Sequence, residues 1–540
     1  MWGRACVDRR RGIVHSLPSV LALTAVLAGS AGQLFAGQKP TSSYVETVLS
    51  IQHLIEANDL AAAHSAIDEA VRQYPANGGI ENLLGIVRIQ QGDTAGARGA
   101  FTAAVRDNPR LVSALLNLAR IDMQSAQSDG TARDEALRLD RRVVALEPRN
   151  DEANYQLATI LSWQKDYRRS ADYLLHLSPQ ARERIASEDL LCTDYASLGD
   201  REATTEAVAS LARNPDLTEQ DADACLPALR SARRADLVDE LFSSVNKTHP
   251  LTPAGQRILG LAFEAEGRLD QARTTLESAF AAGDQSVAVL VDLARVAKNA
   301  GDNTGALGYL AHARAIDPKD PDLAYEFGVV CLRMNLYAES RKAISEALAL
   351  SPNNPDYNFA MGTLASFSDD PSWALPYLTK YHSVRPQDPQ GILALGMANF
   401  RAKDYENSAK WLRKALTYPA TAADAYYYLG RIDREEWHLD QATADLKQSL
   451  ALHPGQARVL AALGQICIEN HNYTEADVYL GQALQLEPDN YDANFGLLQL
   501  YARTGDPRRD AQSKRFDQIK SRQFEQDRQA MRLLEIRPSG

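Results

Sequence analysis

Aromatic and arginine side chains recur at a fixed spacing in the second half of this sequence. Bulky apolar side chains stand 34 positions apart at Tyr325, Phe359, Leu393 and Tyr427. Counted from this offset in each period, Arg295 and Arg431 stand four positions later, Arg434 seven and Arg401 eight. Aromatic rings and guanidinium groups together are favoured at protein-binding hot spots. The pattern therefore predicts a surface that binds a partner rather than a centre that transforms a substrate.

The same residues have a purely structural alternative. The rings can pack between neighbouring helices, and the arginines can form ion pairs with nearby acids, as many surface charges do. In that case neither the rings nor the guanidinium groups would be available to a partner. The sequence alone leaves both interpretations open.

Patterns that support catalysis are absent from the sequence. It contains no His-Glu-x-x-His pair, no Gly-x-Ser-x-Gly elbow and no phosphate-binding loop. The adjacent carboxylates Glu435 and Glu436 would not face each other on a helix, because neighbouring helical residues point in different directions. We therefore predict a non-enzymatic protein with no catalytic residue, no metal ligand and no cofactor.

The cysteines fit a structural role. Cys192, Cys225, Cys331 and Cys467 occupy packing positions of predicted helices, where cysteine behaves as a small hydrophobe. No pair has the spacing of zinc ligands. Cys192 and Cys225 fall in neighbouring repeats, so a disulfide between them is an alternative if the protein is exported.

Charge and hydropathy limit the classes of partner. The 540 residues carry a formal net charge of -12 at pH 7, with 45% hydrophobic and 24% charged residues. An acidic chain without a basic stripe argues against nucleic-acid binding. Beyond the N-terminal segment, no apolar run is long enough to span a membrane.

A 34-residue period positions all of these side chains. The stretch 457–490 contains Leu463-Gly464 in its first half and Pro488 near its end. The same frame recurs upstream with the pairs Leu429-Gly430, Leu395-Gly396, Met361-Gly362 and Phe327-Gly328. A period of this length indicates a solenoid of helical units, none of which can bury its apolar face alone.

The recurring residues have simple physical roles. A glycine in mid-helix costs about 1 kcal/mol relative to alanine, so Gly464 and its equivalents are expected where the partner helix must approach closely. The terminal proline cannot continue a helix and therefore sets the turn to the next unit.

The spacing and these residue types resemble the tetratricopeptide repeat (TPR). The resemblance covers roughly residues 44 to 521 and implies an all-α, right-handed superhelix of about fourteen helix-turn-helix units. It also implies that partner proteins or extended peptides bind in the concave groove lined by the first helices, which would hold the aromatic and arginine residues named above. Some members hold a C-terminal carboxylate with a Lys/Asn pair. The matching positions here, such as Asn82/Ile86 and Leu116/Arg120, lack that pair.

The frame divides the chain into consecutive segments. They are a signal peptide at 1–37, a linker at 38–43, units 1–3 at 44–150, units 4–6 at 151–252, regular units 7–13 at 253–490, and an incomplete unit with a polar capping helix at 491–540. Unit 3 needs an insertion near 127–131, which is expected in the turn between its helices. For the C-terminal helix, a basic docking element is the alternative to a cap.

The repeat pattern weakens over residues 185–252. Pro227 falls inside a predicted first helix, where proline removes a backbone hydrogen bond and is expected to kink or shorten the helix. We interpret the stretch as two degenerate repeats that bend the solenoid, with a separate non-repeat insert as the alternative.

The N-terminal segment has the layout of a secretory signal peptide. An arginine-rich start precedes a short apolar run at 20–28 and then small residues. This predicts an exported protein, periplasmic or secreted, with no membrane span after signal cleavage; an uncleaved N-terminal anchor is the alternative.

We expect a non-enzymatic protein-protein interaction scaffold of the bacterial cell envelope. The alternative is an accessory or regulatory subunit of a polysaccharide-synthesis, polysaccharide-export or glycosyltransferase system. Both functions follow from the TPR resemblance, and fold alone does not decide between them.

Overall fold

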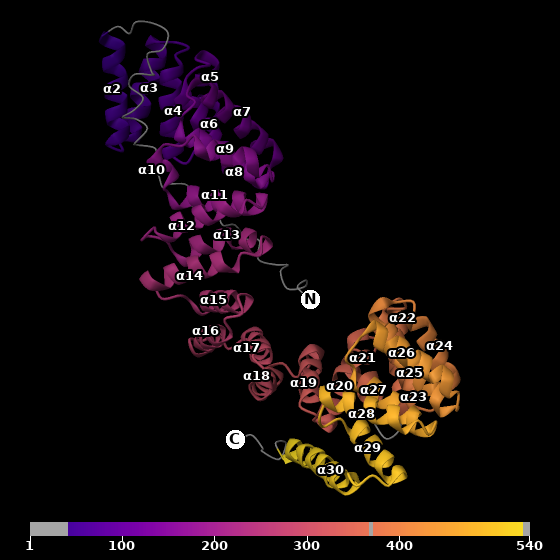
Figure 1. The fold of residues 1–540 in the computed structure, drawn as a ribbon. Coiled ribbons are helices and arrows are strands. Elements are labelled where there is room, and N and C mark those ends of the chain that lie inside the picture. The colour runs from indigo at the N-terminus through magenta and orange to yellow at the C-terminus, as the bar shows by residue number, and fades with distance from the viewer. Residues whose placement is uncertain (1–41, 367–370, 533–540) are drawn as a thin grey trace. The chain divides into compact units, whose positions relative to one another are not determined.

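The computed structural model describes residues 42–366 and 371–532. Within these residues every regular element is helical, from α2 to α30 (Figure 1). About fourteen helix pairs follow one another along the chain, which confirms the predicted fold class. The predicted signal peptide lies outside the described residues.

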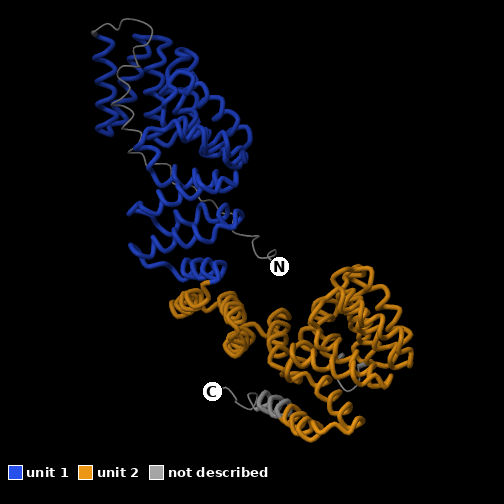
Figure 2. Tube along the Cα trace, in the orientation of Figure 1, with its two compact units in different colours: residues 1–267 blue, residues 268–540 orange. Residues whose placement is uncertain are grey.

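The chain forms two compact units, residues 1–267 and 268–540 (Figure 2). The helices of the first unit are α2 (Ser42–Glu56), α3 (Leu60–Gln73), α4 (Gly78–Gln90), α5 (Thr94–Asp107), α6 (Val112–Met123), α7 (Gly130–Leu146), α8 (Asp151–Trp163), α9 (Tyr167–Leu175), α10 (Pro179–Arg182), α11 (Ile185–Leu198), α12 (Arg201–Ala212), α13 (Glu219–Ser231), α14 (Ala235–Thr248) and α15 (Pro253–Ala265).

The second unit continues the same alternation of first and second helices. Its helices are α16 (Leu269–Ala281), α17 (Val287–Asn299), α18 (Asn303–Ile316), α19 (Pro321–Arg333), α20 (Tyr337–Leu350), α21 (Pro355–Ser366), the 3-10 turn η1 (Pro371–Ala374), α22 (Leu375–Val384), α23 (Pro389–Arg401), α24 (Tyr405–Ala415), α25 (Pro419–Glu435), α26 (Leu439–Leu452), α27 (Ala457–Glu469), α28 (Tyr473–Leu486), α29 (Tyr491–Thr504) and α30 (Arg509–Arg532).

Short turns with defined chemistry join the helices of a pair. The carboxylates of Asp93 and Asp302 accept hydrogen bonds from backbone N–H groups in the first turn of α5 and α18, which caps those helices. The residue before the cap has positive φ, 81° at Gly92 and 62° at Trp437. Glycine takes this conformation without strain, whereas a tryptophan there is strained by about 1–2 kcal/mol.

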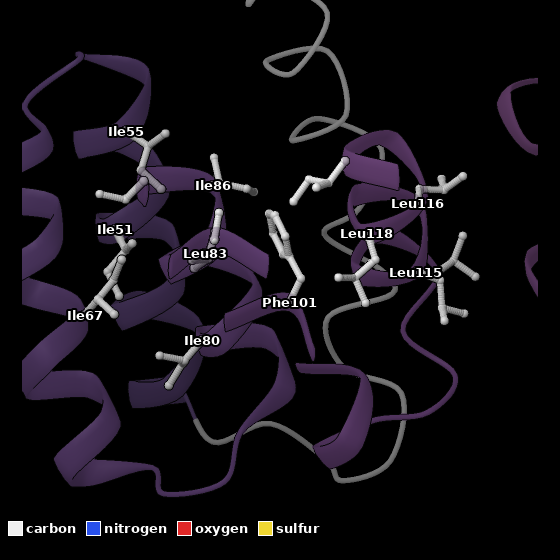
Figure 3. Packing of buried hydrophobic residues seen from close by; sticks show 14 of the residues in the cluster. Ile51, Ile55, Ile67, Ile80, Leu83, Ile86, Phe101, Leu115, Leu116 and Leu118 are labelled. Atoms are coloured by element: carbon white, nitrogen blue, oxygen red, sulfur yellow. The ribbon is translucent and has the colours of Figure 1, made fainter. Parts of the chain in front are cut away.

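Close contact between the two helices of a pair explains the recurring glycine. A Cβ atom on Gly85 would lie 2.3 Å from a ring carbon of Phe101, and one on Gly464 would lie 2.6 Å from Leu480 Cγ. Phe101 is fully buried beside Leu83, Ile86 and Leu118 in the core of the first unit (Figure 3). The glycine therefore makes room for the large residue of the second helix.

Pro227 does not shorten its helix, contrary to one of the two outcomes expected from the sequence. Helix α13 runs through it from Glu219 to Ser231 and has the same 13 residues as α15. Pro227 and Asp223, whose carbonyl loses its usual helical partner, are both exposed. Water can satisfy that carbonyl, so the proline is tolerated there.

Two helix boundaries differ from the repeat frame. Helix α25 begins at Pro419, four residues before the expected Ala423, because proline suits the first turn of a helix. The short helix α10 adds one turn between α9 and α11. The insertion predicted near 127–131 lies partly in the turn that ends at Asp129, the N-cap of α7, and partly in the start of α7, which begins at Gly130.

Helix packing changes within the stretch 185–252. In most pairs the second helix packs on the first helix of the next pair, as α5 does on α6 and α24 on α25. Here α11 packs directly on α13, and α12 packs on α14 in addition to its own pair partner α11. The repeat period continues through this stretch, but its helices are stacked in a different way.

Helix α30 packs against the last regular helix. The ring of Phe516 lies 4.9 Å from that of Tyr491 and 5.5 Å from that of Phe495, centroid to centroid. Phe516 and Ile519 are buried. These contacts cover the end of the apolar core, as a capping helix would; the docking role proposed as its alternative stays a prediction.

Candidate functional site

The sequence-predicted binding residues lie on first helices of the second unit. Arg295 is on α17, Tyr325 on α19, Phe359 on α21, Arg401 on α23, and Tyr427, Arg431 and Arg434 are on α25. Successive first helices from α19 to α27 contact one another, whereas the second helices of these pairs make no comparable contacts among themselves. We call the surface formed by α19, α21, α23, α25 and α27 the first-helix face.

Four side chains from three of these helices form an alternating stack. Arg431 Cζ lies 4.9 Å from the ring centroid of Phe400 and 5.8 Å from that of Tyr427. Arg458 Cζ, from α27, lies 4.7 Å from the Tyr427 ring. Cations over aromatic rings at these distances are held by about 0.5–2 kcal/mol each. We call this group of Phe400, Tyr427, Arg431 and Arg458 the arginine–aromatic stack.

The rings of the stack are part of the core. Phe400 is 9% exposed and Tyr427 is 5% exposed. The Phe400 ring lies 5.4 Å from that of Tyr428 and 5.8 Å from that of Tyr405. Tyr427 therefore packs as the structural alternative expects, and its contribution to a binding surface is to hold the two guanidinium groups.

The arginines of this face differ in their partners. Arg434 forms a bidentate ion pair with Glu469, at 2.6 Å from Nη2 and 3.1 Å from Nε to Oε1. Arg295 Nη2 lies 2.9 Å from Asp292 Oδ1. Arg458 forms an ion pair with Asp424. The charges of these three arginines are therefore matched inside the protein.

Arg431 is the exception among the described residues of this face. It is half-buried, and no carboxylate of the described chain lies within 4.0 Å of its guanidinium group. Its hydrogen bond to the Tyr427 hydroxyl is long, at 3.5 Å. The stack thus occupies the faces of the guanidinium plane but leaves its N–H edge largely unused.

Positive charge gathers around Tyr428. Burial raises the pKa of the Tyr428 phenol, and the nearby charges of Arg458, Arg431 and Arg401 oppose that rise. Arg401 itself is exposed on α23. Three guanidinium groups thus gather near one phenol, and the charge of one of them, Arg458, is matched by Asp424.

Tyr325 and Phe359 do not join the stack. Each pairs with a ring of its own neighbourhood, Tyr325 with Tyr357 at 4.9 Å and Phe359 with Tyr381 at 4.8 Å. Burial raises the pKa of Tyr325 to about 12, so its phenol stays neutral near pH 7. Both side chains remain partly exposed on the first-helix face.

Sequence reasoning missed Arg458 as a member of the group. It lies on the next first helix, at 31 positions after Tyr427, and therefore shares no offset with the other arginines. Arg458 pairs with Asp424 of the preceding unit, so a search for contacts between consecutive units could have found it.

One group of described residues has the composition of a metal site. Asp433 lies in the last turn of α25, and Glu436 and His438 lie in the turn that follows it, with potential ligand atoms within 4.8 Å of one another. His438 Nδ1 is 3.7 Å from Asp433 and 3.6 Å from Glu436. Exposed acidic groups of this kind are common on protein surfaces, and we assign no metal to it.

The cysteines of the described chain are free thiols. Burial raises the pKa of Cys331 to about 12, and a hydrogen bond with Cys192 together with burial raises the pKa of Cys225. Protonated, buried thiols are poor nucleophiles. The burial and raised pKa of these cysteines agree with a role in helix packing rather than in catalysis.

Comparison with known families identifies the repeats. Tetratricopeptide repeat family models match residues 50–110, 82–121, 297–362 and 457–490. The chain is a tetratricopeptide repeat protein. Repeats of this family indicate a protein-protein interaction scaffold, and TPR proteins are generally non-catalytic. None of the helices described here has the length and apolarity needed to cross a membrane.

Two curated proteins match part of the chain. The BBSome complex member bbs-4 of Caenorhabditis elegans is 28% identical over 174 residues, 31% of this chain and 38% of that protein. A TPR repeat-containing protein of Pseudomonas aeruginosa is 26% identical over 188 residues, 34% of this chain and 32% of that protein. The chain therefore spans about a third of the length of the curated relatives it matches.

Solved TPR structures are similar at low identity. A tetratricopeptide repeat protein from Parabacteroides merdae aligns with a TM-score of 0.41 and 14% identity, covering 46% of this chain and 98% of that one. The Cut9–Hcn1 heterotetramer of the APC/C aligns with a TM-score of 0.37 and 14% identity, covering 88% and 99%. We draw no functional argument from either.

Proposed function

We propose that this TPR protein binds partner proteins or extended peptide segments on the first-helix face of its second unit. The observation that carries the proposal is the arginine–aromatic stack, in which Arg431 has no carboxylate partner among the residues that the structure describes. Partly exposed Tyr325 and Phe359 on the same face supply apolar contact area. Aromatic and arginine anchors of this kind dominate the free energy of many protein interfaces.

We further propose that the protein works in the bacterial cell envelope, after export. The arginine-rich start and apolar run within residues 1–37 support this location. Cell fractionation followed by N-terminal sequencing tests it. A processed product in the periplasm or medium is expected, whereas a cytoplasmic product that retains Met1 would contradict export.

A pull-down with matched variants tests the binding face. Tyr325→Ala with Phe359→Ala removes two partly exposed rings from α19 and α21. Tyr337→Ala with Tyr377→Ala removes two tyrosines from α20 and α22, the second helices of the same pairs, and serves as the control. Tyr427 is left unchanged because its ring is buried.

The first double variant is expected to lose partners from an envelope extract, while the control double variant retains them. Mass spectrometry of the captured proteins provides the readout. If both double variants capture the same proteins as the wild type, binding on the first-helix face is wrong.

A further inference from the structure

We infer that Arg431 is the anchor of the first-helix face for a carboxylate, so that the segment bound there is acidic. The inference rests on the proposed function and specifies the chemistry of the partner. It concerns one guanidinium group whose surroundings differ from those of Arg295, Arg434 and Arg458, each of which has a carboxylate partner.

The first step of the argument is the fixed orientation of the group. Phe400 and Tyr427 lie on the guanidinium of Arg431 at 4.9 and 5.8 Å. The N–H donors of a guanidinium lie in its plane, so rings that cover its faces do not consume them. Stacking also limits the side-chain entropy that a new hydrogen bond would cost, because the group is already held in place.

The second step is charge. Arg434 and Arg458 lie on the same face and each already has a carboxylate, from Glu469 and Asp424. Arg431 has none within the described chain, although it is half-buried. A partly desolvated charge without a counter-ion gains more from a ligand carboxylate than a charge already paired.

The third step is the kind of anion. The planar donor fork of arginine matches a carboxylate in a bidentate manner. A peptide offers this group either as an Asp or Glu side chain or as its C-terminus. The net charge of -12 opposes a long polyanion such as nucleic acid, while a single carboxylate needs only the guanidinium group of Arg431.

Selection of peptides on the full-length protein provides the probe. Random 12-residue peptides displayed on phage are selected on the wild type, and the enriched sequences are synthesised with a fluorescein label. Each is compared with versions in which the acidic residue is replaced by its amide or the C-terminus is amidated. These two changes separate a side-chain carboxylate from a terminal one.

Binding is then measured by fluorescence anisotropy for the wild type, Arg431→Gln, Arg431→Lys and the control Arg413→Gln. Arg413 is exposed on the second helix α24. Arg431→Gln is expected to weaken binding by about tenfold or more, Arg431→Lys by less, and Arg413→Gln not at all. Neutralising the peptide carboxylate should weaken binding to the wild type but not further weaken binding to Arg431→Gln.

The inference would be overturned if neutralising the peptide carboxylate weakened binding equally for the wild type and for Arg431→Gln. It would also be overturned if the selected peptides were not enriched in acidic residues. If such peptides still lose binding with Tyr325→Ala and Phe359→Ala, the proposed function stands and only the role of Arg431 fails. If no peptide depends on either site, both fail. Thermal denaturation of each variant by circular dichroism confirms that the comparison is made between folded proteins.

Discussion

The first helices of the first unit are joined by polar side chains, whereas those of the second unit are joined by stacked rings and guanidinium groups. In the first unit, Asn117 Nδ2 donates to Asn82 Oδ1 at 3.0 Å, and Arg120 Nη1 donates to Asn117 Oδ1 at 2.9 Å. Arg120 also forms an ion pair with Glu152, which accepts from Gln156 Nε2 at 3.0 Å. In the second unit, the arginine–aromatic stack of Phe400, Arg431, Tyr427 and Arg458 takes the place of this series of hydrogen bonds.

The difference lies in what each arrangement leaves unused. In the first unit, Asn117 and Glu152 accept hydrogen bonds from Arg120, and Glu152 also neutralises its charge. These interactions link neighbouring first helices and stabilise their packing. The arginine–aromatic stack covers the faces of Arg431 but leaves its N–H edge largely unused and its charge without a carboxylate partner among the described residues. One repeat frame therefore supports structure in the first unit and offers a binding group in the second.

Buried acids mark a second contrast. Asp189 and Asp194 lie on α11 in the first unit, and each has an oxygen atom with no hydrogen-bond partner. Burial raises the pKa of Asp189 to about 7 and that of Asp194 to about 6. The arginine–aromatic stack of the second unit contains no such group.

The largest expected effect is therefore a dependence of the first unit on pH. The pKa of Asp189 is about 7 in the folded protein and near 3.8 in the unfolded chain, so the folded protein holds the proton more tightly. The stability gained from this proton is complete below about pH 3.8 and is lost as the pH rises through about 7. Since one pKa unit corresponds to about 1.4 kcal/mol, Asp189 alone accounts for up to about 4 kcal/mol across this range.

Hydrogen exchange of helix α11, corrected for intrinsic rates and measured at pH 5 and 8, tests this expectation. Protection in the wild type should fall at pH 8, and Asp189→Asn should reduce that fall. The conservative change Asp172→Asn on α9, an exposed acid, is the control. The same pH dependence in Asp189→Asn as in the wild type would show that Asp189 is not its source.

Adding a methyl group at the recurring glycine should affect the two units unequally. Gly85→Ala brings Cβ to 2.3–2.7 Å from three ring atoms of Phe101, and a rigid ring cannot move locally. Gly464→Ala brings Cβ to 2.6 Å from Cγ and 2.7 Å from Cδ2 of Leu480, whose side chain can turn about its single bonds more readily than a ring can shift. We expect losses of about 3 and about 1 kcal/mol in the free energy of unfolding, measured by urea denaturation. Equal losses would mean that the ring of Phe101 adapts as readily as leucine.

Removing the arginine of each arrangement should give opposite results. Arg120→Ala leaves Glu152 and Asn117 without their partner and is expected to cost about 2 kcal/mol of stability. Arg431→Ala leaves no carboxylate unpaired and should cost less than about 1 kcal/mol, while weakening partner binding. Thermal denaturation and pull-down of both variants provide the comparison. A strongly destabilised Arg431→Ala would make Arg431 a structural residue.

The smallest effect concerns the turn between the helices of a pair. Trp437 has φ of 62° and is 72% exposed, whereas the equivalent turn residue Gly92 has φ of 81°. Trp437→Gly should stabilise the protein by about 1 kcal/mol, and Gly92→Ala should destabilise it by a similar amount. Differential scanning calorimetry resolves both shifts. A loss of stability in Trp437→Gly would indicate that the indole makes a contact which outweighs the strain.

The period predicted the helices because it records core packing. Helices α8, α11, α13 and α17 begin at the residues that the frame assigned, Asp151, Ile185, Glu219 and Val287. Pro419 extended α25 because a local first-turn preference outweighed the frame. The recurring Leu-Gly stretch at 457–490 belongs to this shared core.

The candidate site was predictable only in composition. The spacing placed Tyr427 and Arg431 one turn apart on α25, and Phe400 lies on the preceding first helix. The spacing could not predict that Tyr427 is buried, that Arg434 forms an ion pair with Glu469, or that no carboxylate of the described residues lies within 4.0 Å of Arg431. Those outcomes depend on side chains 31 to 35 positions away, whose approach is set by how successive pairs stack.

Site-specific photo-cross-linking tests the central claim most directly. A benzophenone amino acid replaces Gln390, exposed on the first helix α23, or Lys410, exposed on the second helix α24 of the same pair. Irradiation with envelope extract is expected to attach partner proteins at position 390 and not at position 410. Partners attached only at position 410 would contradict binding on the first-helix face.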